Sequence, residues 1–316
     1  MARTGKGSDG GALATRLFRV VDSDLLHSFL KSKLVVLAAF ATLLLIALSL
    51  LAPWIAPHNP FDLKSLDLLD SHTPPVWEEG GDPRFLLGTD DQGRDILSAI
   101  LYGARSSIAV GVFSVLLAMV LGVSLGLIAG YYGGPIDGVV MRIADVQLTF
   151  PAILIALLID GVARVLLGGH KGAGSEFSIL VISIGLSYWV QYARTVRGVT
   201  LVERNKEYVQ AARLIGLGSF DIMFRQVLPN VLSPVLVIAT INLALAILTE
   251  ATLSFLGVGL PPAEPSLGML IRIGNNFLMS GEYWIVMFPG VALAALVLAV
   301  NLLGDWLRDA LNPKLR

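Results

Sequence analysis

The sequence predicts an all-α polytopic membrane protein with six transmembrane helices and one long cytoplasmic loop. Of its 316 residues, 55% are hydrophobic and only 15% are charged, and the mean hydropathy is +0.74. The apolar residues are gathered into six uncharged runs, and the polar stretch before the fifth run has the pattern of two short amphipathic helices. A net charge of −1 excludes a globally basic nucleic-acid binder, and the lack of cysteine excludes disulfides and cysteine-based metal sites.

Six runs without Asp, Glu, Lys or Arg mark the predicted spans. Four of them exceed the roughly 18 apolar residues that cross a bilayer, whereas the third has 14 residues and the fourth has 17. The third reaches the needed length if Arg142 extends to the headgroups and Asp145 faces protein. The runs are 34–61, 106–136, 146–159, 177–193, 226–249 and 283–304.

Basic residues set the expected orientation. With the N-terminus inside, sixteen of the 23 lysines and arginines lie on the cytoplasmic side and seven lie outside, as the positive-inside rule requires. We therefore expect both termini and the polar loop in the cytoplasm. The expected parts are a tail with an uncleaved amphipathic helix at 1–33, the first span at 34–56, an extracytoplasmic segment at 57–103, a five-span core at 104–309 and a cytoplasmic C-terminus at 310–316.

The outer segment holds an acidic stretch at 85–95. Its aspartates do not have the spacing of an EF-hand calcium loop. Thr89 followed by Gln92 matches a capping box, so we expect the helix of the second span to begin there.

Small residues recur at every fourth position of the second span. They are Ser114, Ala118, Gly122, Gly126, Gly130 and Gly134. This spacing predicts a ridge, centred on Gly122, Gly126 and Gly130, against which another helix packs backbone to backbone. Residues 122–126 also match the nucleophile-elbow pattern of hydrolases, but all four histidines lie outside the predicted spans, so the required partner is missing.

The polar loop at 199–230 is the most informative part of the chain. Its first helix has an apolar and a polar face, formed by Tyr208, Ala211, Ala212 and Ile215 and by Lys206, Glu207, Gln210 and Arg213. Asn205 is the expected N-cap and Gly216 the C′ glycine. Ser219 would cap a second helix, which Pro229 would end. Two short helices joined by a glycine elbow are predicted.

The apolar face of this loop can dock on protein or on lipid. A lipid-bound face would favour Leu, Phe or Trp. Ala211 and Ala212 place small side chains at its centre instead, which favours the close approach of another protein.

On these residues the loop resembles the cytoplasmic loop of permease subunits of bacterial ABC importers. The family pattern is Glu-Ala-Ala, three residues, Gly, nine residues, Ile, one residue and Leu-Pro. This chain has Gln210 in place of the Glu and Gln226 in place of the Ile, and its other pattern residues agree. The resemblance implies that the loop couples to a separate ATPase subunit through Glu207, Gln210, Ala211, Ala212, Gly216, Leu228 and Pro229.

Further stretches resemble the dipeptide/oligopeptide/nickel branch of these importers. They are 85–95, 261–268, where Leu267 stands in place of the usual Trp, and 301–309, so the resemblance covers about residues 30–316. It implies a type I importer permease in the bacterial inner membrane that passes short peptides, or a related small solute, by alternating access. The implied partners are a second similar permease, two cytoplasmic ATPase subunits and an extracytoplasmic solute-binding protein. The chain itself would be no enzyme and would need no cofactor.

Four polar residues in or beside the runs are candidates for the translocation path, and interhelical hydrogen bonding is the alternative for each. They are Gln147, Gln191, Asn242 and Glu250. The alternative function is an ion-coupled secondary transporter, which would place coupling carboxylates near the midplane, whereas Asp145 and Glu250 lie near run ends. The sequence offers no catalytic set, no metal-ligand set and no phosphate-binding loop.

Overall fold

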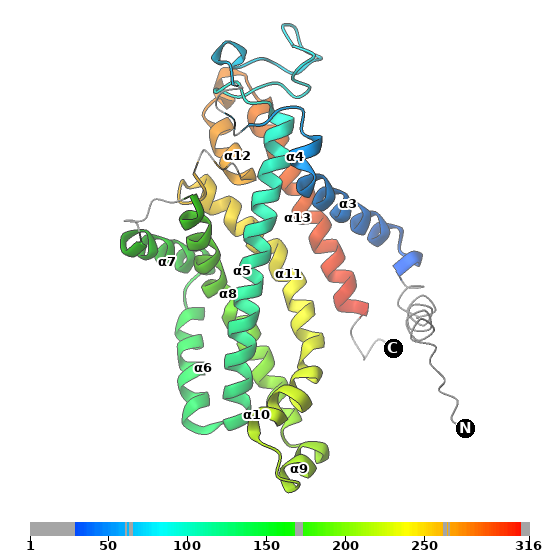
Figure 1. The fold of residues 1–316 in the computed structure, drawn as a ribbon, viewed down its shortest axis with the longest axis vertical. Coiled ribbons are helices and arrows are strands. Elements are labelled where there is room, and N and C mark those ends of the chain that lie inside the picture. Colours follow the sequence, from blue (N-terminus) through cyan, green and yellow to red (C-terminus); the bar gives the residue numbers. More distant parts are fainter. Residues whose placement is uncertain are drawn as a thin grey trace, which may run out of the picture.

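The computed structural model describes residues 29–60, 62, 66–167, 173–261, 264 and 266–310. These residues form an all-helical structure (Figure 1), as predicted. Most of the predicted N-terminal tail and residues 311–316 lie outside the described part.

The long helices follow the apolar runs because a chain in lipid must satisfy its backbone hydrogen bonds internally. The α-helices are α3 (Lys33–Leu50), α4 (Ala52–Ile55), α5 (Ile96–Tyr132), α6 (Gly134–Leu148), α7 (Ala152–Leu167), α8 (Ala173–Glu203), α9 (Glu207–Leu214), α10 (Ser219–Asp221), α11 (Leu228–Phe255), α12 (Leu267–Asn275) and α13 (Trp284–Ala310). Short 3-10 turns lie at Leu68–Asp70 and Leu278–Ser280.

Within the described residues, four helical segments are long and apolar enough to cross a membrane: α3, α5, Ser219–Phe255 and α13. The pair α6 and α7, bent by 100°, adds a fifth if it is one broken span. The predicted third span was wrong as one straight helix, because Pro151 lies at the bend and disfavours helical conformation in Phe150. The predicted fourth span lies within α8, which has 31 residues but is less apolar.

α5 and α8 lie side by side and approach each other backbone to backbone (Figure 1). A Cβ atom at Gly126 would lie 2.6 Å from the carbonyl oxygen of Ala193, and one at Gly130 would lie 2.7 Å from Cβ of Thr200. Gly122 meets α8 in the same way. These three glycines let the two helices come closer than any side chain would permit.

The ridge ends before Gly134, which the sequence had assigned to it. α5 stops at Tyr132, and Gly133 turns the chain with a φ of +69°. Gly134 then begins α6 with open space around its Cβ position.

The start of α5 differs from the predicted capping box. Asp95 is the N-cap, and its carboxylate accepts a hydrogen bond of 2.9 Å from the backbone N–H of Ser98. Thr89 instead donates its hydroxyl to the carbonyl oxygen of Asp70 at 2.6 Å. The acidic stretch is therefore a folded loop ahead of the helix.

The second helix of the polar loop does not end at Pro229, contrary to prediction. α10 continues through a π-helical segment, Ile222–Val227, into α11, so Ser219–Phe255 is one helical stretch. Pro229 lies in the first turn of α11, where the altered hydrogen bonding of the π segment accommodates its missing N–H. The loop is thereby joined to a span without a flexible break.

The segment 66–95 lies at the end of the molecule opposite α9 and α10 (Figure 1). It is fastened to the start of α13: Nδ1 of His72 lies 2.6 Å from Oε2 of Glu282, and the indole N–H of Trp284 donates to the carbonyl oxygen of Thr89 at 3.2 Å. The polar loop and the segment 66–95 are thus separated by the full length of α5 (Figure 1).

Replacing Gly126 by alanine tests the ridge. The added methyl group would meet the carbonyl oxygen of Ala193, so we expect a loss of about 1–3 kcal/mol in the free energy of unfolding. Gly138 of α6 has open space at its Cβ position, and Gly138→Ala should not destabilise the protein. Thermal unfolding of the purified variants measures the difference, and equal midpoints would contradict backbone-to-backbone packing.

Candidate functional site

The polar loop is an elbow whose bend depends on one glycine. After α9, the N–H of Leu217 donates to the carbonyl oxygen of Ala212, and the N–H of Gly216 donates to that of Arg213, both at 3.0 Å. This is a Schellman motif, in which Gly216 takes a φ of +80° that other residues adopt only with strain. The predicted C′ role of Gly216 is confirmed.

The predicted caps of the elbow are each displaced by one residue. Lys206 is the N-cap of α9 and Gly218 that of α10, in place of Asn205 and Ser219, and neither residue makes a side-chain hydrogen bond that caps its helix. The elbow is therefore held by tertiary contacts rather than by N-caps.

The buried face of α9 differs from the predicted face. Val209 and Ala212 pack into the core with the start of the π segment, whereas Ala211 and Ile215 are exposed. Ala212, which the sequence assigned to the contact with a partner, lies against its own chain with 4% exposure. Its small side chain seats α9 and leaves other residues to form the outer surface.

The outer surface of the elbow is an apolar tip, of which the sequence predicted only Ile215. We define the tip as Leu214, Ile215 and Phe220, which are 90%, 78% and 67% exposed. Glu207, Gln210 and Ala211 are also exposed on α9. At the C-terminal end of the predicted coupling loop, Leu228 is half-buried and Pro229 is exposed. The signal in the sequence is a set of apolar residues on both sides of the glycine turn. The sequence does not show which of these residues are buried, so it could not define the tip.

A polar network braces the elbow against α8 and α11. The carboxylate of Glu203 accepts hydrogen bonds from Nζ of Lys206 at 2.6 Å and from the hydroxyl of Tyr208 at 2.5 Å. The Tyr208 hydroxyl in turn accepts from the side-chain amide of Asn230 at 3.0 Å. The end of α8, the start of α9 and the start of α11 therefore share one network.

The network shifts the titration of its members. Burial acts to raise the pKa of Glu203, but hydrogen bonds from Lys206 and Tyr208 outweigh it and hold that pKa below its usual value. Burial and the bond to the Glu203 carboxylate raise the pKa of Tyr208 to about 12. At neutral pH the network therefore holds an ionised Glu203 and a protonated Tyr208.

The elbow is also fastened to the C-terminal end of α5. The guanidinium of Arg204 donates to the carbonyl oxygens of Gly130 at 2.8 Å and Tyr131 at 3.2 Å. A cation at a helix C-terminus is favourable because it satisfies the last carbonyls and the helix dipole. The guanidinium of Arg213 lies 5.1 Å from the ring centroid of Tyr131. A displacement of the elbow must therefore reach α5 as well as α8 and α11.

Three of the four candidate path residues are turned into the helix bundle. Gln147 donates to the carbonyl oxygen of Leu186 at 2.7 Å and accepts from the indole N–H of Trp189 at 2.8 Å. Asn242 and Glu250 are fully buried. Only Gln191, among the four, is exposed.

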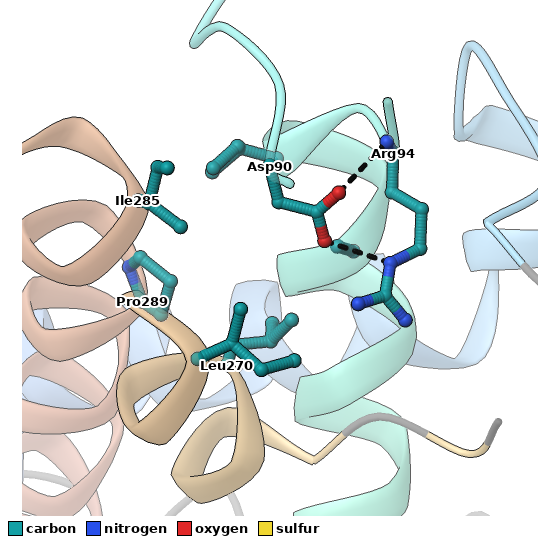
Figure 2. A pocket seen from close by; sticks show the side chains of 8 residues that line it. Asp90, Arg94, Leu270, Ile285 and Pro289 are labelled. Carbon is teal, nitrogen blue, oxygen red and sulfur yellow. Dashed lines mark hydrogen bonds and ion pairs between the residues drawn. The ribbon is translucent and has the colours of Figure 1, made fainter. Parts of the chain in front are cut away.

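The described residues hold no group of three His, Asp or Glu side chains that could bind a metal ion. A small open cavity lies far from the elbow, between the start of α5, α12 and α13 (Figure 2). Its wall includes the buried ion pair of Asp90 and Arg94, at 2.7 Å, and the apolar side chains of Leu270, Ile285 and Pro289.

Comparison with known proteins identifies this architecture. Residues 122–316 match the family described as binding-protein-dependent transport system inner membrane component. Residues 23–75 match the N-terminal TM domain of oligopeptide transport permease C. The chain belongs to this family of permeases. It is a multi-pass inner-membrane component of a binding-protein-dependent ABC transporter, as the loop predicted.

Individual relatives cover most of this permease. It is 42% identical over 275 residues to the dipeptide transport system permease protein DppC of Haemophilus influenzae, spanning 87% of this chain and 88% of the relative. It is 38% identical over 288 residues to the glutathione transport system permease protein GsiD of Pectobacterium atrosepticum, spanning 91% and 89%.

Solved structures share the fold. The permease resembles a chain of the MetNI methionine ABC transporter in an inward-facing conformation, with a TM-score of 0.53, 20% identity and coverage of 69% of this chain and 98% of that chain. At this identity the likeness supports the helical arrangement alone.

Replacing Glu203 by glutamine tests the brace. We expect α9 to lose about 1–3 kcal/mol of local stability near neutral pH, because a charge-assisted network becomes neutral. The lowered pKa means that this contribution is present above the unfolded pKa of Glu203 and is lost as the pH falls through the lower folded value, so the two proteins should converge in acid.

Amide hydrogen exchange of residues 207–214 measures this local stability. Glu207→Gln, on the exposed side of α9, is the matched control and should change it by less than about 0.5 kcal/mol. Equal exchange in both variants would show that the brace does not hold the elbow.

Proposed function

We propose that this permease carries short peptides, or a related small solute, across the inner membrane by alternating access. The dipeptide and glutathione permeases among its relatives support a short peptide as the solute. The other subunits are proposed to be a second, similar permease, two cytoplasmic ATPase subunits and an extracytoplasmic solute-binding protein. Membership of an ATP-driven family argues against the ion-coupled alternative.

The exposed tip of the elbow is the observation that carries the coupling role. Leu214, Ile215 and Phe220 present apolar surface at one end of the molecule, beyond the spans and next to polar residues of α9. A pocket in an ATPase subunit would bury this surface, as apolar anchors do in other interfaces. Glu207, Gln210 and Ala211 flank it, while Ala212, Gly216, Leu228 and Pro229 set its shape.

Bracing makes the elbow able to transmit force. The network of Glu203, Tyr208 and Asn230, together with Arg204, ties it to three long helices. When ATP binding draws the ATPase subunits together, the elbow and these helices move as one body. The spans then rock from an inward-open to an outward-open arrangement.

The translocation path is proposed to run between the two permeases, along the exposed face of α8 that carries Gln191. A polar side chain exposed on a span favours protein or water over lipid as its neighbour. Gln147 is bonded within the bundle, and Asn242 and Glu250 are enclosed by it. These three are proposed to support the helices behind the path.

Replacing Ile215 by glutamate tests the docking of the tip. Burying an unpaired carboxylate would cost several kcal/mol, so ATPase co-purification should fall sharply and solute-stimulated hydrolysis should be lost. Leu69→Glu makes the same change at a residue that is exposed at the opposite end, and it should leave co-purification intact. Retention of the ATPase subunits by Ile215→Glu would remove the tip from the interface.

Single cysteines test the orientation, since the chain has none of its own. Ser71 belongs to the outer segment and Ser219 to the elbow. A membrane-impermeant maleimide added to intact cells should label the Ser71→Cys protein and label Ser219→Cys only after lysis. The reverse pattern would place the elbow outside the cell and contradict its coupling role.

A further inference from the structure

Glu250 lies fully buried where α5, α11 and α12 meet. Its Oε1 atom accepts a hydrogen bond of 2.7 Å from the hydroxyl of Ser254, one turn further along α11. Its Oε2 atom is enclosed without an aligned donor, and Ser107 of α5 and Ser266, the N-cap of α12, lie beside the carboxyl group. Rotation of either hydroxyl would direct its proton to the carboxyl oxygen.

The same two serines hold the first turn of α12. The N–H of Leu267 donates to Oγ of Ser107, and the N–H of Met269 donates to Oγ of Ser266, both at 3.2 Å. Each hydroxyl thus accepts from α12 and has one proton left to donate. An acceptor oxygen at Glu250 completes the arrangement.

Close backbone contacts show that α12 joins the core to the outer end. A Cβ atom at Gly268 would lie 2.3 Å from the carbonyl oxygen of Ala251, and one at Gly274 would lie 2.5 Å from the carbonyl carbon of Ile285. α12 therefore touches α11 at its start and α13 at its end. α13 in turn carries the outer segment through the contact of Trp284 with that segment.

A small open cleft borders α12. The cavity of Figure 2 lies between its side chain Leu270, the start of α5 at Ala99, and Ile285 and Pro289 of α13. α12 is therefore tightly fixed at its N-terminus by close backbone contacts and by the two serine hydroxyls, while a small open cleft borders its flank.

We propose that Glu250 is a positioning residue for transport: it fixes the N-terminus of α12 to α5 and α11 and keeps the outer end closed until the solute-binding protein docks. This inference rests on the proposed function and adds a part to it. When the solute-binding protein docks on the outer segment, it displaces α13 and with it α12. The outer end opens when α12 separates from Glu250 and Ser107. Glu250 contributes by holding α12 in the closed position and has no contact with solute.

The experiment uses the complete transporter in lipid nanodiscs with Leu270→Cys as a reporter. Leu270 is buried in α12, so its cysteine should react slowly with a maleimide until α12 moves. Glu250→Ala should raise the labelling rate without binding protein, and raise hydrolysis without binding protein, each by at least about fivefold, the low end of typical coupling between sites. Uptake should fall because hydrolysis no longer awaits the loaded binding protein.

Two variants refine the test. Glu250→Gln keeps one acceptor but adds N–H donors beside hydroxyls that already accept from α12, so it should raise both rates by a smaller factor. Ser107→Ala removes the link between α5 and α12 and should act in the same direction as Glu250→Ala. Thr252→Ala is the matched control, because the Thr252 hydroxyl donates to the carbonyl oxygen of Leu248 in its own helix, and it should behave like the parent.

The outcomes separate the inference from the proposed function. Parental labelling in assembled Glu250→Ala or Glu250→Gln transporters would overturn the positioning role. If Glu250→Ala does not assemble, Glu250→Gln decides: faster labelling supports the role, and an unchanged rate rejects it. Labelling does not depend on hydrolysis, so a parent transporter without ATPase stimulation by binding protein would contradict the proposed function alone.

Discussion

The close approach of α5 and α8 is the constraint on which the rest of the structure depends. Gly122, Gly126 and Gly130 present no side chain from α5, so its backbone meets the carbonyl oxygens and Cβ atoms of α8 over two turns of helix. Lipid provides no hydrophobic drive for helices to associate, and close packing must supply the attraction instead. The two helices then form a rigid pair. α11 is joined to this pair by the hydrogen bond between the hydroxyls of Tyr188 and Thr249 at 2.8 Å.

The same helices reach both ends of the permease. Arg204 binds the last carbonyls of α5, and Ser107 of the same helix holds α12 about 35 Å away, at 1.5 Å of rise per residue. α11 also links the two ends, since it begins at the elbow and carries Glu250 near its far end. A rigid displacement of the elbow is therefore transmitted along continuous helices to the opposite end of the molecule.

The sequence predicted those features that depend on local spacing. The ridge was visible because glycines four residues apart share a helix face, and Gly216 because a helix that ends in a turn needs a residue with positive φ. The burial of Ala212 against its own chain was not predicted, because α9 is short and only its neighbours decide which face is buried. Pro229 was misread as a helix end, because whether its missing N–H matters depends on the π segment before it. The brace of Glu203, Tyr208 and Asn230 joins residues up to 27 positions apart, and no spacing rule brings them together.

The polar residues within the spans are used mainly to hold helices together. Gln147 links α6 to α8, the Tyr188–Thr249 pair links α8 to α11, and Glu250 lies at the start of α12. Each such group is costly in lipid unless it is bonded, so its position fixes which helices must stay adjacent. Such a permease has few polar groups available to bind a solute. Of the four candidate path residues, Gln191 alone is exposed. Under the proposed function, selection among solutes is made before entry, by the solute-binding protein, and the helices change which side of the membrane the path faces.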